Sequence, residues 1–166
     1  MSKLNKIQFT GERLIPEYNK KTAFYYEHLA RYFFSTQLVK NKIVLDAGCG
    51  SGYGSYILSK HGQAKKIYGI DISKESISYA KEYYQYKNIN FKLGDIKKLK
   101  KTKDKSIDIT TAFEVIEHIY KQNEFLQQIK RVLKKNGLLI VSTPNKYNYP
   151  KGNKFHVKEL YPEEFL

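Results

Sequence analysis

The chain has 166 residues, of which 41% are hydrophobic and 28% charged, and this length and composition suit one globular domain. It has no run of about 18 apolar residues that could cross a membrane, no apolar block near its N-terminus, and no partner for its lone Cys49, so we expect a cytoplasmic protein without disulfides. The net charge of +14 permits nucleic acid as a partner but does not favour it, because only three of the 30 basic residues are arginines, whose planar guanidinium suits phosphate and base edges best.

The predicted elements alternate between helices and strands. An irregular segment and one amphipathic helix, over residues 24–33, precede the first strand. Five short runs rich in β-branched residues have the length of strands, and these are residues 43–45, 67–70, 89–93, 107–112 and 138–142. Helix-period segments separate several of them, which indicates right-handed crossovers and a parallel sheet covered on both faces.

One helix end is predicted from its own residues. The apolar stripe over residues 125–133 is followed by Lys134 and Lys135, which suit the negative end of a helix dipole. Asn136 and Gly137 then have the residue types of a left-handed helix end. We therefore expect the helix to reach Lys135 and the next strand to begin at Leu138.

The strongest motif is a glycine-rich loop at residues 46–54, directly after a strand and before a helix. Glycines let backbone N–H groups at a helix N-terminus approach a ligand closely, as in nucleotide-binding βαβ units. Asp71 ends the next strand, at about the spacing of a ribose-binding carboxylate. The pattern predicts a nucleotide-like ligand.

The spacing of the glycines indicates which nucleotide. A dinucleotide fingerprint would require glycine at Tyr53 or Ser55, so both registers fail. Residues 46–52 read D-x-G-x-G-x-G, which resembles the signature loop of class I S-adenosylmethionine-dependent methyltransferases. Further stretches resemble later motifs of that family, and these are residues 68–73, 93–96, 108–119 and 133–144.

The resemblance implies a three-layer Rossmann-like α/β fold with strand order 3-2-1-4-5. The family fold has seven strands, so the last two would be missing and the chain looks C-terminally truncated. We divide a single domain, residues 1–166, into an N-terminal segment and helix (1–40), a cofactor-binding core (41–145) and the start of an incomplete C-terminal part (146–166). The exposed edge of the fifth strand would then need a dimer or another polypeptide to cover it.

The resemblance also implies cofactor contacts for S-adenosylmethionine or its product S-adenosylhomocysteine. The glycine loop would hold the methionyl part, Asp71 the ribose and Asp95 the adenine amino group. The full set of cofactor-binding residues expected is Arg13, Asp46, Gly48, Cys49, Gly50, Gly52, Asp71, Ile72, Asp95, Ile96 and Phe113. Asp46 would contact the methionyl ammonium through water, and Arg13 or Arg31 would pair with the cofactor carboxylate.

His118 is the candidate catalytic residue, because similar sugar O-methyltransferases use a histidine at the corresponding position as general base. Alternatively, it caps the following helix or shapes the pocket. His28 and His156 are weaker candidates, since resemblance alone places their segments. Although Glu114, Glu117 and His118 could suggest a metal site, the stretch resembles metal-independent members, so we expect no metal.

The expected function is methyl transfer to a hydroxyl of a small molecule or glycan. A weaker resemblance, at residues 9–16, 27–32 and 155–165, implies this kind of acceptor as the partner. An RNA methyltransferase is one alternative, although the fourth motif lacks the Asn/Asp-Pro-Pro-Tyr/Phe pattern of base-methylating members. A cofactor-binding fragment without catalysis is another.

Overall fold

The computed structural model describes residues 13–16, 20–148 and 153–165, so parts of the predicted N-terminal and C-terminal segments, including residues 9–12, lie outside the described residues. The elements in chain order are α2 (Ala23–Thr36), β1 (Ile43–Ala47), α3 (Tyr53–Lys60), β2 (Lys66–Asp71), α4 (Lys74–Tyr83), β3 (Ile89–Leu93), β4 (Ile107–Phe113), the 3-10 helix η1 (Ile116–His118), α5 (Gln122–Val132), β5 (Leu133–Ser142) and α6 (Pro162–Phe165). Among the described residues, no helix is both long and apolar enough to span a membrane.

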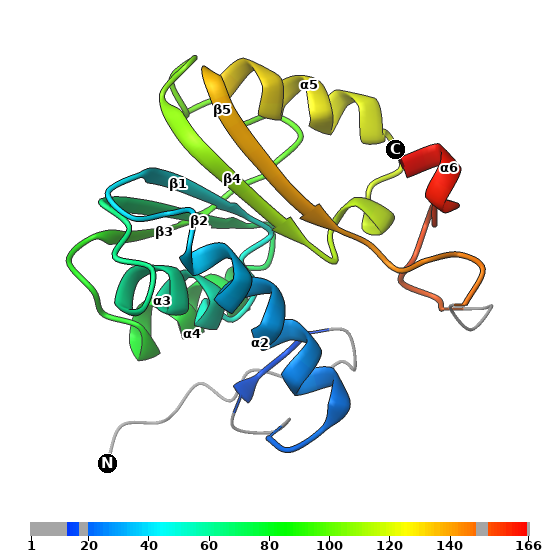
Figure 1. Ribbon diagram of the computed structural model, residues 1–166, viewed down its shortest axis with the longest axis horizontal. Helices are drawn as coiled ribbons and strands as arrows, with labels where there is room; N and C mark the ends of the chain where they lie inside the picture. The colour runs from blue at the N-terminus through cyan, green and yellow to red at the C-terminus, as the bar shows by residue number, and fades with distance from the viewer. Residues whose placement is uncertain (1–12, 17–19, 149–152, 166) are drawn as a thin grey trace.

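The five strands form one sheet in the order β3-β2-β1-β4-β5, and every neighbouring pair is parallel. This confirms the predicted strand order and the three-layer fold. Helices α2, α3 and α4 lie on one face of the sheet and α5 on the other (Figure 1).

Two apolar cores hold the layers together. On the face of α2 and α3, Val44 and Ile67 of the central strands pack with Leu58, and all three are fully buried. On the other face, Leu45 packs with Phe125 of α5. Because β1 is buried on both faces, its residues are apolar without alternation except at Asp46.

The expected helix end at Asn136 and Gly137 is wrong. Helix α5 ends at Val132, and β5 begins at once with Leu133, which pairs with Ile107. The register between β4 and β5 then shifts before Leu138. Leu133 packs against the core beneath α5, so burial of this side chain turns the backbone into the strand earlier than the lysines and Gly137 suggest.

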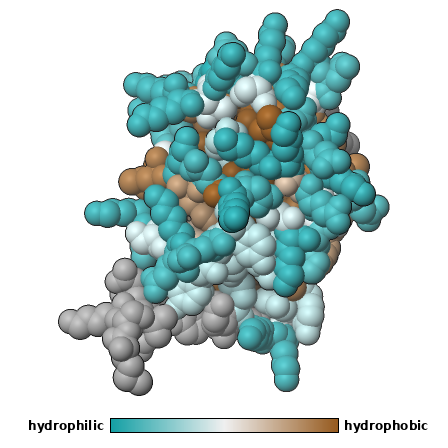
Figure 2. Space-filling model, turned by 90° about the vertical axis from the view of Figure 1, so that its left-hand side faces the viewer, coloured by the Kyte–Doolittle hydropathy of each residue, from teal (hydrophilic) through white to brown (hydrophobic). Residues whose placement is uncertain are grey.

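The strands run toward the side of the molecule that also carries η1, α6 and the C-terminal segment (Figure 1). The opposite side, where the strands begin, is covered largely by hydrophilic side chains with small apolar patches between them (Figure 2). The carboxyl ends of parallel strands are where folds of this type hold ligands, and the site is found there.

Candidate functional site

A cavity of about 520 Å³ opens at the carboxyl ends of β1, β2, β3 and β4. Each strand is followed by residues that line it, and these are Gly48–Ser51 and Tyr53 after β1, Ile72 after β2, Gly94–Lys97 after β3, and Glu114, Val115, His118 and Ile119 after β4. The last residues of β2 and β4, Asp71 and Phe113, line it too. Of the twelve predicted site residues, only Asp46 and Gly52 do not line this cavity.

The glycine loop needs glycine for two different reasons. Gly48, Gly50 and Gly52 all have positive φ, at 76°, 51° and 88°, a region that other L-residues rarely adopt. A Cβ on Gly48 or Gly52 would also collide, with Val115 Cγ2 at 2.5 Å and Ala80 Cβ at 2.6 Å respectively. A Cβ on Gly50 would meet only Arg13 Cγ, at 3.8 Å, among the described residues. Gly50 is therefore the glycine of the loop whose Cβ position is uncrowded. Gly52 is the N-cap of α3, and its missing side chain allows close packing there.

Asp71 connects the glycine loop to the end of β2. Its Oδ2 accepts a hydrogen bond from Gly50 N at 2.9 Å, and its Oδ1 accepts one from Ser73 N at 2.8 Å. Beside it Ile72 is 75% exposed, although it is a large apolar side chain. A carboxylate next to an exposed apolar side chain at a cavity wall suits a sugar hydroxyl pair and an aromatic base.

Asp95 and Ile96 form the neighbouring wall after β3. Asp95 Oδ1 accepts a hydrogen bond from Lys97 N at 2.9 Å, and Lys97 Nζ lies 3.9 Å from the other carboxylate oxygen. This Asx-type turn fixes the carboxylate at the cavity. The structure thus brings together two carboxylates, Asp71 and Asp95, from adjacent strands.

Asp46 lies beneath the loop and is fully buried. Its carboxylate accepts hydrogen bonds from the hydroxyls of Tyr32 (3.0 Å), Ser55 (2.6 Å) and Thr111 (3.0 Å). Burial raises the pKa of this carboxyl, while the three hydroxyl donors oppose that effect. Through these hydrogen bonds, Asp46 links α2, α3 and β4 beneath the cavity. Its contact with a ligand stays a prediction.

Comparisons with known proteins agree with this geometry. A family model described as "Methyltransferase domain" matches residues 38–164. The chain belongs to the methyltransferase domain family. Its fold is that of the class I S-adenosylmethionine-dependent methyltransferases, and S-adenosylmethionine is the cofactor of this family.

Individual relatives are similar over most of the chain. A protein of Mycolicibacterium smegmatis named "Probable S-adenosylmethionine-dependent methyltransferase" is 30% identical over 163 residues, covering 95% of this chain and 62% of its own. A ubiquinone biosynthesis O-methyltransferase of Coxiella burnetii is 33% identical, covering 81% and 64%. A solved structure of a Pyrococcus horikoshii protein has a TM-score of 0.68 and 28% identity, covering 81% and 61%. The chain therefore spans less than two thirds of the length of these relatives.

In this methyltransferase domain, polar side chains line the side of the cavity next to α2, and their positions there were not predicted from the sequence. His28 Nδ1 lies 3.1 Å from the hydroxyl of Tyr53, which sequence analysis missed as a cavity residue. Burial, and then the positive charge of Arg31, lower the pKa of His28 to about 4. His28 is thus held neutral near pH 7.

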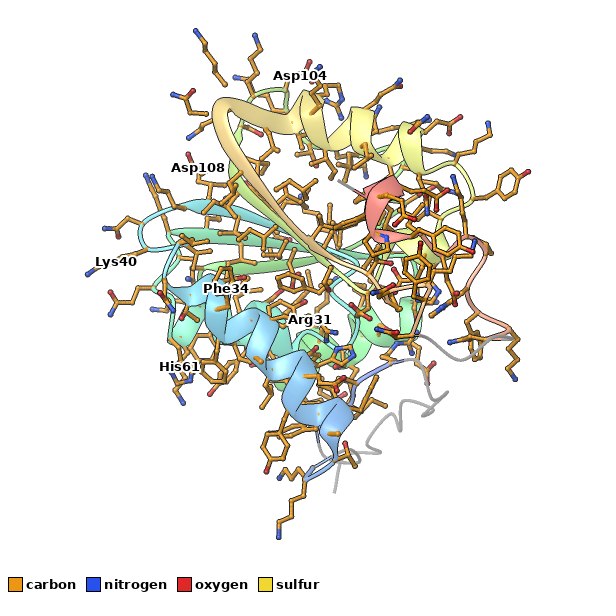
Figure 3. The ribbon with its side chains drawn as sticks, turned by 45° about the vertical axis from the view of Figure 1, so that its right-hand side comes forward. Arg31, Phe34, Lys40, His61, Asp104 and Asp108 are labelled. Carbon is orange, nitrogen blue, oxygen red and sulfur yellow. The ribbon has the colours of Figure 1, made fainter. Side chains whose placement is uncertain are left out.

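The two candidate arginines have partners within the protein. Arg31 projects from α2 toward the carboxyl ends of the strands (Figure 3), and its Nη2 lies 3.3 Å from Glu114 Oε1. Glu114 also accepts a hydrogen bond from Ser142 Oγ at 2.7 Å and has a φ of 54°. Arg13 lines the cavity and lies 4.0 Å from Glu75. Arg13, rather than Arg31, is therefore the arginine placed to meet a ligand.

His118 lies in the cavity wall at the end of η1. Its Nδ1 is 2.9 Å from the carbonyl oxygen of Phe155, and its Nε2 is 4.0 Å from Glu117 Oε1. Glu117 is fully buried, and this burial raises the pKa of its carboxyl to about 7. The ring of His156 packs edge-on against that of His118, with 5.0 Å between their centroids. Of the two weaker histidine candidates, His28 thus lines the cavity itself, and His156 packs against the cavity residue His118.

Proposed function

We propose that the chain transfers a methyl group from S-adenosylmethionine to a hydroxyl group of a small molecule or glycan. One observation carries the proposal. Asp71, Asp95 and Gly50, whose Cβ position is uncrowded, surround a single cavity in a chain of the methyltransferase domain family. The ubiquinone biosynthesis O-methyltransferase among its relatives supports a hydroxyl acceptor.

The residues present suit the cofactor. Asp71 offers two carboxylate oxygens to the ribose, and the exposed Ile72 offers an apolar surface to the adenine. Asp95 and the Ile96 backbone would bind the adenine edge, and the Phe113 carbonyl would bind the methionyl ammonium. The bound cofactor supplies a methyl group on a sulfonium, which makes that group a good electrophile. The protein's task is to hold the acceptor in line with it.

His118 is the group we assign to the acceptor hydroxyl, which loses its proton as it attacks. Since Phe155 O lies against Nδ1, that nitrogen carries the proton in the neutral ring, and Nε2 holds the lone pair. A general base contributes about 10² to 10⁴ in rate. His28 is less suited to this role, because its pKa is lowered to about 4.

Calorimetry and transfer assays test this proposal separately. S-adenosylhomocysteine should bind the folded chain with measurable heat, and labelled methyl groups should pass to hydroxyl acceptors. His118→Ala should lower turnover by about 10² or more with little change in cofactor affinity. His61→Ala is the matched control, because His61 lies on the opposite side of the molecule from α6 (Figure 3). Absence of cofactor binding would contradict the proposal, and equal losses of turnover and affinity in His118→Ala would contradict the base.

RNA remains the alternative acceptor because lysines gather in one place. A second cavity, of about 530 Å³, has five of them in its wall, namely Lys92, Lys98, Lys100, Lys101 and Lys103. If RNA were the acceptor, binding would weaken steeply as salt rises, because phosphate contacts release counterions. Binding of a neutral hydroxyl compound would hardly respond to salt.

A further inference from the structure

Three potential metal ligands converge beside the cavity wall. One ligand atom each from Glu117, His118 and His156 all lie within 4.8 Å of one another. Glu117 Oε1 is buried and has no hydrogen-bond partner among the described residues. An unpartnered, fully buried carboxylate oxygen is costly, and here it is aimed at an imidazole 4.0 Å away.

The other ligand atom of each residue is held by a neighbour. Thr143 donates a hydrogen bond to Glu117 Oε2 at 3.0 Å. The Nδ1 atom of His118 lies 2.9 Å from Phe155 O, and that of His156 lies 2.8 Å from Glu159 Oε1. Histidines that bind metals almost always donate their other ring N–H to a carbonyl or carboxylate in this way, which fixes the tautomer and raises the basicity of the ligand nitrogen.

We propose that Glu117, His118 and His156 bind one divalent transition-metal ion of the Zn²⁺ class. The site uses Glu117 Oε1 and the Nε2 atoms of both histidines, and the ion replaces the contact of His156 Nε2 with Asn153 Nδ2 at 3.1 Å. From the sequence alone, the candidate ligands are Glu114, Glu117 and His118, and no metal is expected. His156 completes a different set of ligands, which only the fold brings together. The proposal goes beyond the proposed function and does not rest on it.

The donor set selects the ion. Two imidazoles and one carboxylate suit Zn²⁺ and neighbouring first-row ions, whereas Mg²⁺ and Ca²⁺ prefer oxygen ligands. Ligands about 2.1 Å from one ion lie no more than about 4.2 Å apart. The ligand atoms of the three residues lie within 4.8 Å of one another in the structure. Binding of an ion therefore draws these atoms closer together.

The site joins the C-terminal segment to the core. Glu117 and His118 belong to η1, and His156 belongs to a segment already held there by hydrogen bonds from Val157 N and Lys158 N to Glu117 O. His118 and Phe155 of these two pieces line the cavity. An ion would thus fix the cavity wall. Because it would occupy Nε2 of His118, the general-base role proposed for His118 applies only to a chain without the ion, and the two roles exclude each other in any one molecule. The two roles differ in the residues that they need. A general base needs only His118, whereas the ion needs His156 as well.

Metal titration of the untagged full chain tests the proposal. The protein is treated with EDTA, desalted and titrated with Zn²⁺ against a chromophoric zinc indicator. We expect one equivalent of Zn²⁺ per chain, and no displacement of it by excess Mg²⁺. His156→Ala should weaken Zn²⁺ binding by at least about tenfold, while His61→Ala should bind as the wild type does. No stoichiometric binding, or equal affinity in the wild type and His156→Ala, would overturn the site.

A second variant covers the case in which His156→Ala does not fold. Glu159→Ala keeps His156 and removes only the carboxylate on its Nδ1, and it should weaken Zn²⁺ binding by about 10- to 100-fold. Unchanged affinity in this variant would equally refute the proposal. Calorimetry with S-adenosylhomocysteine, run on the same samples with EDTA present, reports the cofactor site alone. A chain that binds the cofactor but no Zn²⁺ therefore refutes the ion site and leaves the proposed function standing.

Discussion

Asp71 and Gly50 are joined by a hydrogen bond of 2.9 Å from the Gly50 amide to the Asp71 carboxylate. The bond links the loop after β1 to the end of β2, so the part of the cavity that would take a methionyl group is tied to the part that would take a ribose. Asp71 therefore holds the loop, in addition to the ribose binding that we propose for it.

Replacement of Asp71 should separate these tasks. Asp71→Ala should weaken S-adenosylhomocysteine binding by about 1.5–3 kcal/mol, the scale of hydrogen bonds to a charged group. Asp71→Asn retains an acceptor oxygen for Gly50 N and should lose less. Asp104→Ala is the control, because Asp104 pairs with Arg131 far from the cavity (Figure 3). Calorimetry that finds wild-type affinity in Asp71→Ala would place the ribose elsewhere.

The glycines of the loop should differ in what they contribute. Gly52→Ala has two costs. The positive φ strains an alanine by about 1–2 kcal/mol, and the new Cβ would lie 2.6 Å from Ala80 Cβ. Together they should lower the free energy of unfolding by about 2–5 kcal/mol. Gly50→Ala makes only an ordinary van der Waals contact, with Arg13 Cγ at 3.8 Å, and should cost only the strain of the positive φ, about 1–2 kcal/mol. Denaturant unfolding measures both. A greater loss of stability in Gly50→Ala would mean that this loop packs differently.

The sequence allowed much of this site to be predicted, for a physical reason. Parallel strands end at one edge of a sheet, so Asp71 and Asp95 had to lie close together once their strands were recognised. The position of His156 could not be predicted in the same way, since residues 146–161 have no helical or strand period to place them. Asp46 shows a further limit, because a motif position does not reveal that three hydroxyls from separate elements enclose its carboxylate.

Tyr32 should stabilise the fold through Asp46. Tyr32→Phe removes one of the three donors to a buried carboxylate and should lower the free energy of unfolding by about 1.5–3 kcal/mol. Tyr26→Phe, at a tyrosine 58% exposed on the same helix, is the matched control and should be close to neutral. If Asp46 acts only beneath the cavity, cofactor affinity at a temperature where both proteins are folded should change little. A large loss of affinity in Tyr32→Phe would instead support a direct role in binding for Asp46 or for the Tyr32 hydroxyl, because Tyr32 itself lines the cavity.

His28 should make the fold less stable in acid. Its pKa falls from 6.5 to about 4 on folding, because burial and Arg31 disfavour the charged ring, so the unfolded chain binds more protons between these two values. The contribution of His28 to the free energy of unfolding is therefore complete above pH 6.5 and is lost as the pH falls toward 4, by at most about 3 kcal/mol. Glu117 acts with the opposite sign, because burial raises its pKa to about 7.

The difference between His28→Gln and the wild type isolates this contribution, since the Glu117 term is common to both. Gln keeps a hydrogen-bonding group for the Tyr53 hydroxyl and does not titrate. Denaturant unfolding at pH 7, 5.5 and 4.5 in the presence of EDTA should show the wild type losing more stability on acidification than His28→Gln does. Parallel pH profiles would show that the His28 ring is protonated as readily in the folded chain as in the unfolded one, and that neither burial nor Arg31 keeps this ring neutral.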